Sequence, residues 1–501
     1  MPNFFPSRLS HQTVQFFSEV GGPLLNLDVL LFILTFLPYH DLIAMMRSCH
    51  FLYTQGLKIL IRNQPDIVMR GKTAMGFLGF ILVKPELRAR HLRALSPTFR
   101  MLTPKIAQSL RIVLEHAHNL EILSLDECEY LARLDPSIIP AICGLKKLKQ
   151  INLQGIGETW GKMLKVFDAP LVHADIVIDH PWLLDAAPDA SCMLTKCART
   201  LLYLTTNARF RSVCHYDKVV GLELLNNDVR DIGPLIESFP NLQKLTINLT
   251  SWWVAKSYLL DASDIELSAI RTQNQRRQQH NSWEKLSYLQ GDARSLYVLG
   301  LHTRVRLLTL DMRPNYFIYI PPIKYGRAVI SDTRPDQLAL QIRYGDFEED
   351  DLARLLNGLS LKFLTLDVLI QEEDELDERD IAGLFYMLAE GLADTEITHI
   401  LIFVSDVDDP DRPMSPVVDA LLQRIDLYRG ARYFLKFVRH LLYLRISTLA
   451  DEQDAAWRVV NYEDGVFLDP IPAIGDLSKF GEDLPECSRL RRHLSRKIPE
   501  V

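Results

Sequence analysis

Apolar residues recur along most of this chain with the spacing Leu-x-x-Leu-x-Leu. The copy at Leu120 is the most complete, because Cys128 also occupies the polar end position of the repeat pattern. Further copies begin at Leu148, Val219, Leu242, Val305, Leu361, Ile397 and Leu441. The last two apolar positions of each copy are two residues apart, which is the side-chain period of a β-strand with one buried face.

This pattern predicts parallel strands that lie side by side in one sheet. The predicted strands span residues 121–126, 149–154, 243–248, 306–311, 362–367 and 442–446. Because side chains alternate along a strand, every second residue lies beneath the sheet. The residues predicted to be buried there are Leu123, Ile151, Leu245, Leu308, Leu364 and Leu444.

Helices are predicted between several of the strands. The segments 104–117, 136–143 and 234–239 each begin with proline, which suits the first position of a helix. One strand and one helix per unit is the plan of a leucine-rich-repeat solenoid, with a parallel sheet on the concave face and helices outside. The predicted fold class is therefore α/β. An irregular α/β solenoid that belongs to no named family is the alternative.

Two regions interrupt the repeat. The segment near 251–300 contains a polar run, Arg271 to His280, without apolar periodicity, and it is interpreted as an insertion or a flexible loop. Beyond Asp451 the repeat spacing stops, which predicts that residues 451–501 form a cap and a tail.

A different pattern marks the N-terminal region. Leu30, Ile33, Leu34 and Leu37 share one face of a predicted helix. A proline then ends that helix, and Asp41 is placed to cap a second helix that reaches Leu52. Two helices this short bury little surface by themselves, so docking onto another surface is expected.

This N-terminal stretch resembles an F-box. The matching residues are Leu25, Asp28, Val29, Leu30, Ile33, Leu34, Leu37, Pro38, Asp41, Leu42 and Cys49, while Asn26, Ser48 and His50 depart from the family pattern. The resemblance implies that Leu25, Asp28, Val29, Leu30, Ile33, Leu34, Leu37, Pro38 and Leu42 bind a Skp-type adaptor, and through it a cullin. The alternative is a helical hairpin that packs on its own domain. Changing Ile33 and Leu37 to Asp is predicted to abolish adaptor binding.

The chain as a whole resembles F-box proteins with divergent leucine-rich repeats of the fungal type. The resemblance divides it into an N-terminal extension (1–20), an F-box-like segment (21–64) and connecting helices that cap the solenoid (65–100). The degenerate repeats (101–450) and the C-terminal cap and tail (451–501) follow.

Target-binding residues are expected where repeat strands turn side chains away from the core, because solenoids bind partners on that face. Paired tryptophans after one strand are further candidates, since interfaces favour large aromatic side chains. The candidates are Glu223, Thr246, Asn248, Trp252, Trp253, Thr365, Asp367 and Arg445. Residues 346–380 hold 13 acidic side chains and three basic ones. One interpretation is that the acidic side chains select a basic partner. The simpler one is that they lie in the first turns of two helices, where carboxylates suit the helix dipole.

Composition narrows the function classes. A net charge of −7 over 501 residues argues against nucleic-acid binding, and the longest apolar runs are too short to span a bilayer. Seven scattered cysteines without a Cys-x-x-Cys pair predict no disulfide framework and no zinc site, which fits cytoplasm or nucleus. Five basic residues near the C-terminus are a nuclear address or the basic end of a final helix.

The sequence thus predicts a substrate-recognition adaptor of an SCF-type ubiquitin ligase, without catalytic residues, metal or cofactor. Its partners would be a Skp-type adaptor and a target protein, and neither nucleic acid nor membrane. A leucine-rich-repeat scaffold that binds a protein without degradation is one alternative. An enzyme on an unrecognised α/β fold is the other.

Overall fold

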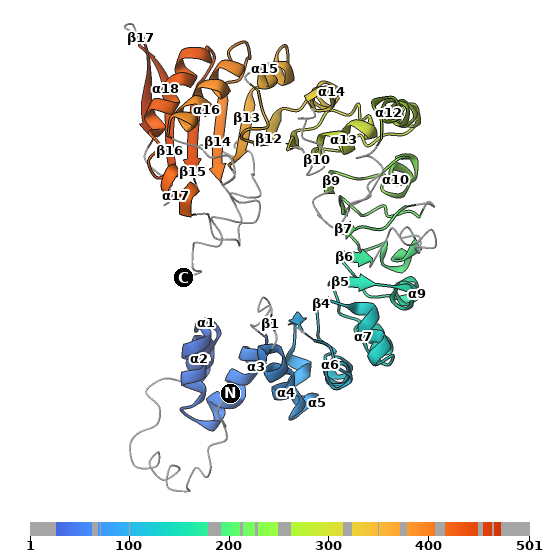
Figure 1. The fold of residues 1–501 in the computed structure, drawn as a ribbon. Coiled ribbons are helices and arrows are strands. Elements are labelled where there is room, and N and C mark those ends of the chain that lie inside the picture. Colours follow the sequence, from blue (N-terminus) through green and yellow to red (C-terminus); the bar gives the residue numbers. More distant parts are fainter. Residues whose placement is uncertain are drawn as a thin grey trace. The chain divides into compact units, whose positions relative to one another are not determined.

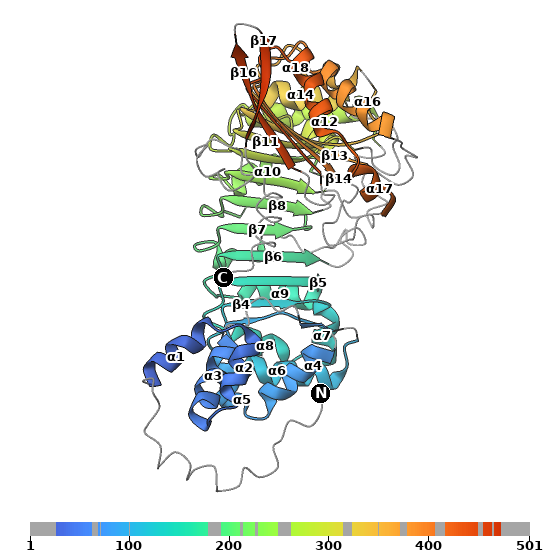
Figure 2. The same ribbon diagram turned by 90° about the vertical axis from the view of Figure 1, so that its left-hand side faces the viewer.

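The computed structural model describes residues 27–62, 69–70, 72–99, 101–178, 192–210, 214–225, 229–248, 262–313, 323–348, 350–370, 378–405, 416–448, 454–462 and 465–471. The chain forms two compact units, residues 1–219 and 220–501. Each unit combines parallel strands with helices along one face of its sheet (Figures 1 and 2). Stacked strand–helix units of this kind are the arrangement of a leucine-rich-repeat-like solenoid.

The first unit begins with helices and continues with strands. Its helices are α1 (Leu27–Phe36), α2 (Tyr39–Met46), α3 (His50–Arg62), α4 (Lys72–Leu82), α5 (Pro85–Arg88), η3 (Ala89–His91), α6 (Pro104–His116), α7 (Cys128–Leu134), α8 (Ile138–Cys143), α9 (Glu158–Val166) and η5 (Thr195–Cys197). Its strands are β1 (Met69–Arg70), β2 (Ala94–Leu95), β3 (Pro97–Thr98), β4 (Ile122–Leu125), β5 (Gln150–Ile156), β6 (His173–Ile178) and β7 (Tyr203–Thr206). The strands β2, β4, β5, β6 and β7 pair in that order, all parallel.

The second unit contains a longer sheet. Its strands are β8 (Gly221–Leu225), β9 (Lys244–Asn248), β10 (Tyr288–Asp292), β11 (Leu307–Asp311), β12 (Gln337–Arg343), β13 (Phe363–Leu369), β14 (His399–Ser405), β15 (Tyr443–Thr448), β16 (Asp454–Tyr462) and β17 (Gly465–Ile471). Its helices are α10 (Gly233–Ser238), α12 (Asp264–Gln278), α13 (Ala293–Leu299), α14 (Ile323–Thr333), α15 (Asp351–Leu356), α16 (Glu378–Gly391), α17 (Pro416–Leu422) and α18 (Leu427–Phe437). The strands β8 to β15 are parallel in chain order, and the antiparallel pair β16–β17 extends the sheet beyond β15.

The predicted strands are confirmed within each unit. All six predicted segments form strands, and within each unit they join one parallel sheet. The six residues predicted to lie beneath the strands, among them Leu123 and Leu308, are completely buried. Helix α6 is confirmed as well: it begins at Pro104, and the Thr103 side chain accepts a hydrogen bond from the Ile106 amide at 3.4 Å. Alternation of side chains therefore located the core correctly.

Nine of the described strands escaped sequence reasoning, and four of them lie between predicted repeat strands: β6, β7, β10 and β12. Each has one non-consensus residue in the Leu-x-x-Leu-x-Leu spacing, namely Ala174, Thr206, Gly291 or Pro335. The glycine is required by packing, because a Cβ atom there would lie 2.8 Å from the Ile247 carbonyl oxygen. At these positions the strand forms without the large apolar residue that the spacing requires. The Leu-x-x-Leu-x-Leu pattern is therefore incomplete there, although the repeat unit is present.

The polar run 271–280 is not the loop or insertion that its composition predicted. It belongs to α12, which begins with a capping box formed by Ser263 and Glu266. Its inner face is held by polar contacts: the Asn274 side chain is buried, accepts from the Ile232 amide at 3.1 Å and donates to the Val298 carbonyl at 2.8 Å. A helix fastened by side-chain hydrogen bonds lacks the apolar stripe by which helices are predicted.

Candidate functional site

The N-terminal helices form a small bundle with its own core. Leu34 and Leu42 are buried together with Met46 and Leu52, and Leu30 and Leu37 pack against them. The helices number three here, because the predicted second helix is interrupted after Met46 and resumes at His50. Leu34 and Leu42, which the F-box resemblance assigns to adaptor binding, therefore lie in the core of this bundle.

Other F-box-like residues lie at the surface or outside the described residues. Asp28 and Pro38 are exposed, and Ile33 is half-buried. Asp41 does not cap the second helix: α2 begins at Tyr39, and Asp41 lies inside its first turn. Leu25 lies outside the described residues. The matching positions of the F-box pattern therefore divide into a core set and a surface set.

Helix α1 carries a second apolar stripe on its outer side. Val29, Phe32 and Phe36 are 43%, 65% and 70% exposed, and the two phenylalanine rings meet edge to face with 4.8 Å between their centroids. We call these three residues the N-terminal apolar face. Sequence reasoning named Val29 of this stripe but missed Phe32 and Phe36, although their i, i+3, i+7 spacing was visible in the sequence. A helix that is apolar on both sides is normally covered on both sides.

The outward-facing residues of the second unit align in cross-strand rows. The first row passes through Glu223, Thr246, Gln290, Thr309, Ala339, Thr365, Leu401 and Arg445. Four of the predicted target-binding residues are thus brought onto one row. Thr365, Leu401 and Arg445 are each only 6% exposed, however. The row is therefore buried over β13 to β15, where an open face was predicted. The target-binding candidates that remain accessible are those nearer β8.

A second row at the ends of the strands is acidic. It passes through Asp292, Asp311, Gln341 and Asp367. Arg313 donates to both carboxylate oxygens of Asp311, at 2.9 and 2.7 Å, and the Gln341 amide donates to Asp367 at 3.2 Å. Burial raises the pKa of Asp292 above its usual range. Of this row only Asp367 was singled out from the sequence. The signal for Asp292 and Asp311 was an aspartate directly after the last position of the repeat spacing. Asn248 ends β9, and its side chain is outside the described part.

An aromatic row crosses β13, β14 and β15 on the same face. The His399 ring stacks on Phe363 with 4.6 Å between ring centroids and lies 6.1 Å from the Tyr443 ring. Desolvation between these rings lowers the pKa of His399 below its usual value near 6.5. These neighbours thus favour the neutral form of the imidazole over the charged form.

This environment predicts a pH-dependent loss of stability. A histidine whose pKa is lowered in the folded state binds its proton more readily when unfolded, so stability falls as the pH drops below about 6.5. Replacing His399 with Phe is expected to flatten this decline between pH 7 and pH 5, as measured by urea unfolding at several pH values. The exposed His440 changed to Phe is the matched control. Equal pH slopes for the parent chain and the His399 variant would contradict the assignment.

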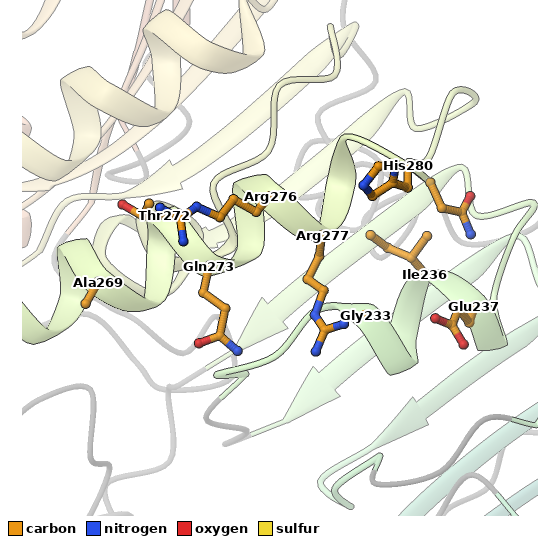
Figure 3. A pocket seen from close by; sticks show the side chains of 10 residues that line it. Gly233, Ile236, Glu237, Ala269, Thr272, Gln273, Arg276, Arg277 and His280 are labelled. Atoms are coloured by element: carbon orange, nitrogen blue, oxygen red, sulfur yellow. The ribbon is translucent and has the colours of Figure 1, made fainter.

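A groove of about 880 Å³ lies between α10 and α12 on the helical side of the second unit (Figure 3). Arg276, Arg277 and His280 approach it from α12 and the residues after it, and Glu237 approaches from α10. Arg277 also faces Asp231 at 3.8 Å. Glu237 and Asp231 therefore place two carboxylates beside the two guanidinium groups, so the groove is mixed in charge. This groove was not predicted, because its arginines come from the run that was interpreted as a loop.

Several sequence hypotheses lie outside the described residues: the paired Trp252 and Trp253, and the basic tail from Arg489 to Lys497. Across the described ranges, no three His, Cys, Asp or Glu side chains gather closely enough to hold a metal ion. Among the helices described, none combines the length and apolarity that crossing a bilayer requires.

No protein-family model matches the chain, and no curated protein matches it in sequence. Among solved structures it is similar to the leucine-rich repeat-containing protein LegL7 from Legionella pneumophila, at 11% identity. That similarity covers 75% of this chain and 93% of that one, with a TM-score of 0.32.

Proposed function

We propose that this chain is a non-enzymatic protein-interaction scaffold whose N-terminal bundle docks onto a Skp-type adaptor of a cullin–RING ubiquitin ligase. In this role the repeats hold a target protein, and the ligase supplies the catalysis while the chain brings the target close to it. The observation that carries the proposal is the N-terminal apolar face. Three large apolar side chains lie on the outside of a bundle whose core is already filled by Leu34 and Leu42.

The energetics favour a covered face. Burying one Phe side chain stabilises a complex by roughly 1.5–3 kcal/mol. Phe32 and Phe36 are packed edge to face before binding, so little side-chain freedom is lost when a partner covers them. The F-box resemblance of the same segment suggests which partner covers this face, namely a Skp-type adaptor. The part of the repeats proposed to contact the target is the outward row near Glu223, Thr246 and Thr309.

Changing both Phe32 and Phe36 to Asp is expected to weaken adaptor binding by at least about a hundredfold, because two buried aromatic contacts are replaced by charges. Binding is measured by titrating the full chain with purified Skp-type adaptor. Both side chains are exposed in the free chain, so its thermal unfolding is expected to stay unchanged. This pair replaces the Ile33 and Leu37 pair as the test, because Leu37 packs against the bundle core.

A matched control is Ile265→Asp, another exposed apolar helix residue changed to the same charge. It is expected to leave adaptor binding intact. Adaptor binding by the Phe32/Phe36 variant with parental affinity, or no binding by the parent chain, would refute the ligase assignment.

A scaffold that binds a protein without degradation is the second candidate. It is favoured by Asn26, which stands where the F-box pattern has a proline that stiffens the partner-binding loop. Affinity capture of the full chain followed by mass spectrometry separates the two candidates: a cullin and its adaptor among the captured proteins support the first, and stable partners without either support the second.

A further inference from the structure

Two cysteines that are distant in the sequence meet in the first unit. The Sγ atoms of Cys192 and Cys214 lie 3.1 Å apart, and no disulfide bond joins them. Cys192 precedes η5, and Cys214 lies beyond β7, so the chain between them contains a whole strand. The sequence predicted no paired cysteines. Cys192 and Cys214 are 22 positions apart, and a third cysteine, Cys197, lies between them.

The two segments are held together by packing that does not depend on the thiols. Met193 and Leu194 are buried beside Cys192, and Tyr216 is buried beside Cys214. The Tyr216 hydroxyl lies within hydrogen-bonding reach of the Leu194 backbone, and burial raises the pKa of this phenol. These anchors keep the sulfur atoms close, so a bond of about 2.05 Å requires the sulfurs to approach by only about 1 Å.

The pair differs from the buried thiols of the same unit. Cys128 and Cys197 are buried, and burial raises the pKa of both, to about 11 for Cys197. Cys197 also points its thiol at the Phe167 carbonyl, 3.5 Å away. Such thiols stay protonated and out of reach of reagents. Cys192 and Cys214 are only half-buried, which leaves them open to small molecules.

We propose that Cys192 and Cys214 are a thiol–disulfide site that reacts with a small-molecule disulfide of the glutathione type. One thiolate attacks a sulfur of the oxidised reagent, which forms a mixed disulfide and releases one reduced thiol. The second cysteine thiolate attacks the protein sulfur of that mixed disulfide, which forms the Cys192–Cys214 bond and releases a second reduced thiol. The protein is oxidised by two electrons, the reagent is reduced by two, and the two cysteine protons end on the released thiols.

Oxidation would close a loop that contains β7. Cross-linking lowers the freedom of the unfolded segment, so the loop opens less often. Native trypsin cleavage at Arg199 and Arg209, which lie inside this loop, is therefore expected to slow in the oxidised chain and to recover on reduction. Reversible pairs of this kind are the form in which disulfides occur in reducing compartments.

The test is a disulfide map of the full chain after incubation in glutathione buffers from reduced to oxidised. Free thiols are trapped with an alkylating reagent, and the chain is digested with trypsin. Cleavage separates the three neighbouring cysteines: Cys192 falls in peptide 166–196, Cys197 in 197–199 and Cys214 in 212–218. We expect peptides 166–196 and 212–218 to appear joined, two hydrogen atoms lighter than their sum, and to separate on reduction.

Cys192→Ser and Cys214→Ser are each expected to abolish the joined peptides, whereas Cys143→Ser, a half-buried cysteine elsewhere in the unit, leaves them unchanged. The map of the parent chain decides the proposal even if a serine variant folds poorly. Two outcomes in oxidising buffer would overturn the proposal. One is a joined peptide that contains Cys197, and the other is Cys192 and Cys214 found only alkylated or singly glutathionylated. The proposal does not rest on adaptor binding, so either can fail alone.

Discussion

Replacing Trp160 with alanine is expected to lower the free energy of unfolding by about 3–5 kcal/mol, the range for removing a large buried aromatic side chain. Trp160 lies in α9, is completely buried, and donates its indole N–H to the Cys128 carbonyl at 2.6 Å. The alanine variant leaves a cavity and removes the hydrogen bond of the indole. Chemical denaturation of the full chain, followed by circular dichroism, measures the change.

Two variants separate these contributions. Trp160→Phe keeps most of the ring volume and loses only the hydrogen bond, so it is expected to recover much of the stability. Val166→Ala removes an exposed apolar side chain from the end of the same helix and is expected to change stability by less than about 0.5 kcal/mol. A Trp160→Ala variant as stable as the Val166 control would show that this side chain does not hold α9 in place.

Replacing Arg271 with alanine is expected to destabilise the second unit, at the lower end of the about 3–5 kcal/mol observed when one partner of a buried ion pair is removed. Arg271 in α12 is ion-paired with Asp332 of α14, and both side chains are largely buried. Its guanidinium group also donates to the Tyr297 carbonyl at 2.8 Å and lies over the Tyr297 ring at 4.5 Å. One arginine thus joins three successive helices, α12, α13 and α14.

The controls for this prediction lie on the same residue and the same helix. Arg271→Lys keeps a positive charge near Asp332 but cannot also bond the Tyr297 carbonyl, so partial recovery is expected. Arg276→Ala removes an exposed arginine one turn and a half further along α12 and is expected to be nearly neutral. Denaturation curves that are the same for Arg271→Ala and Arg276→Ala would refute the role of the ion pair.

Local periodicity was enough to locate eight of the repeat strands and the residues beneath them. Leu123, Leu245 and Leu308 were identified correctly because the two-residue alternation of a strand is a property of a few neighbouring residues. The same reasoning found α6 from Pro104, since a helix start is also a local feature. The F-box-like spacing was visible too, but spacing alone did not say which of its residues would be surface.

Tertiary contacts decided the rest. Both stripes of α1 are apolar, and only the packing of α2 and α3 shows that Leu34 is core and Phe32 is surface. Helix α12 is polar in sequence because Asn274 and Arg271 join it to its neighbours through hydrogen bonds and an ion pair, which no periodicity records. Cys192 and Cys214 meet because Tyr216 and Leu194 pack together across 22 residues. Such contacts depend on residues distant in the chain, so pattern alone could determine the repeats but not the surfaces they present.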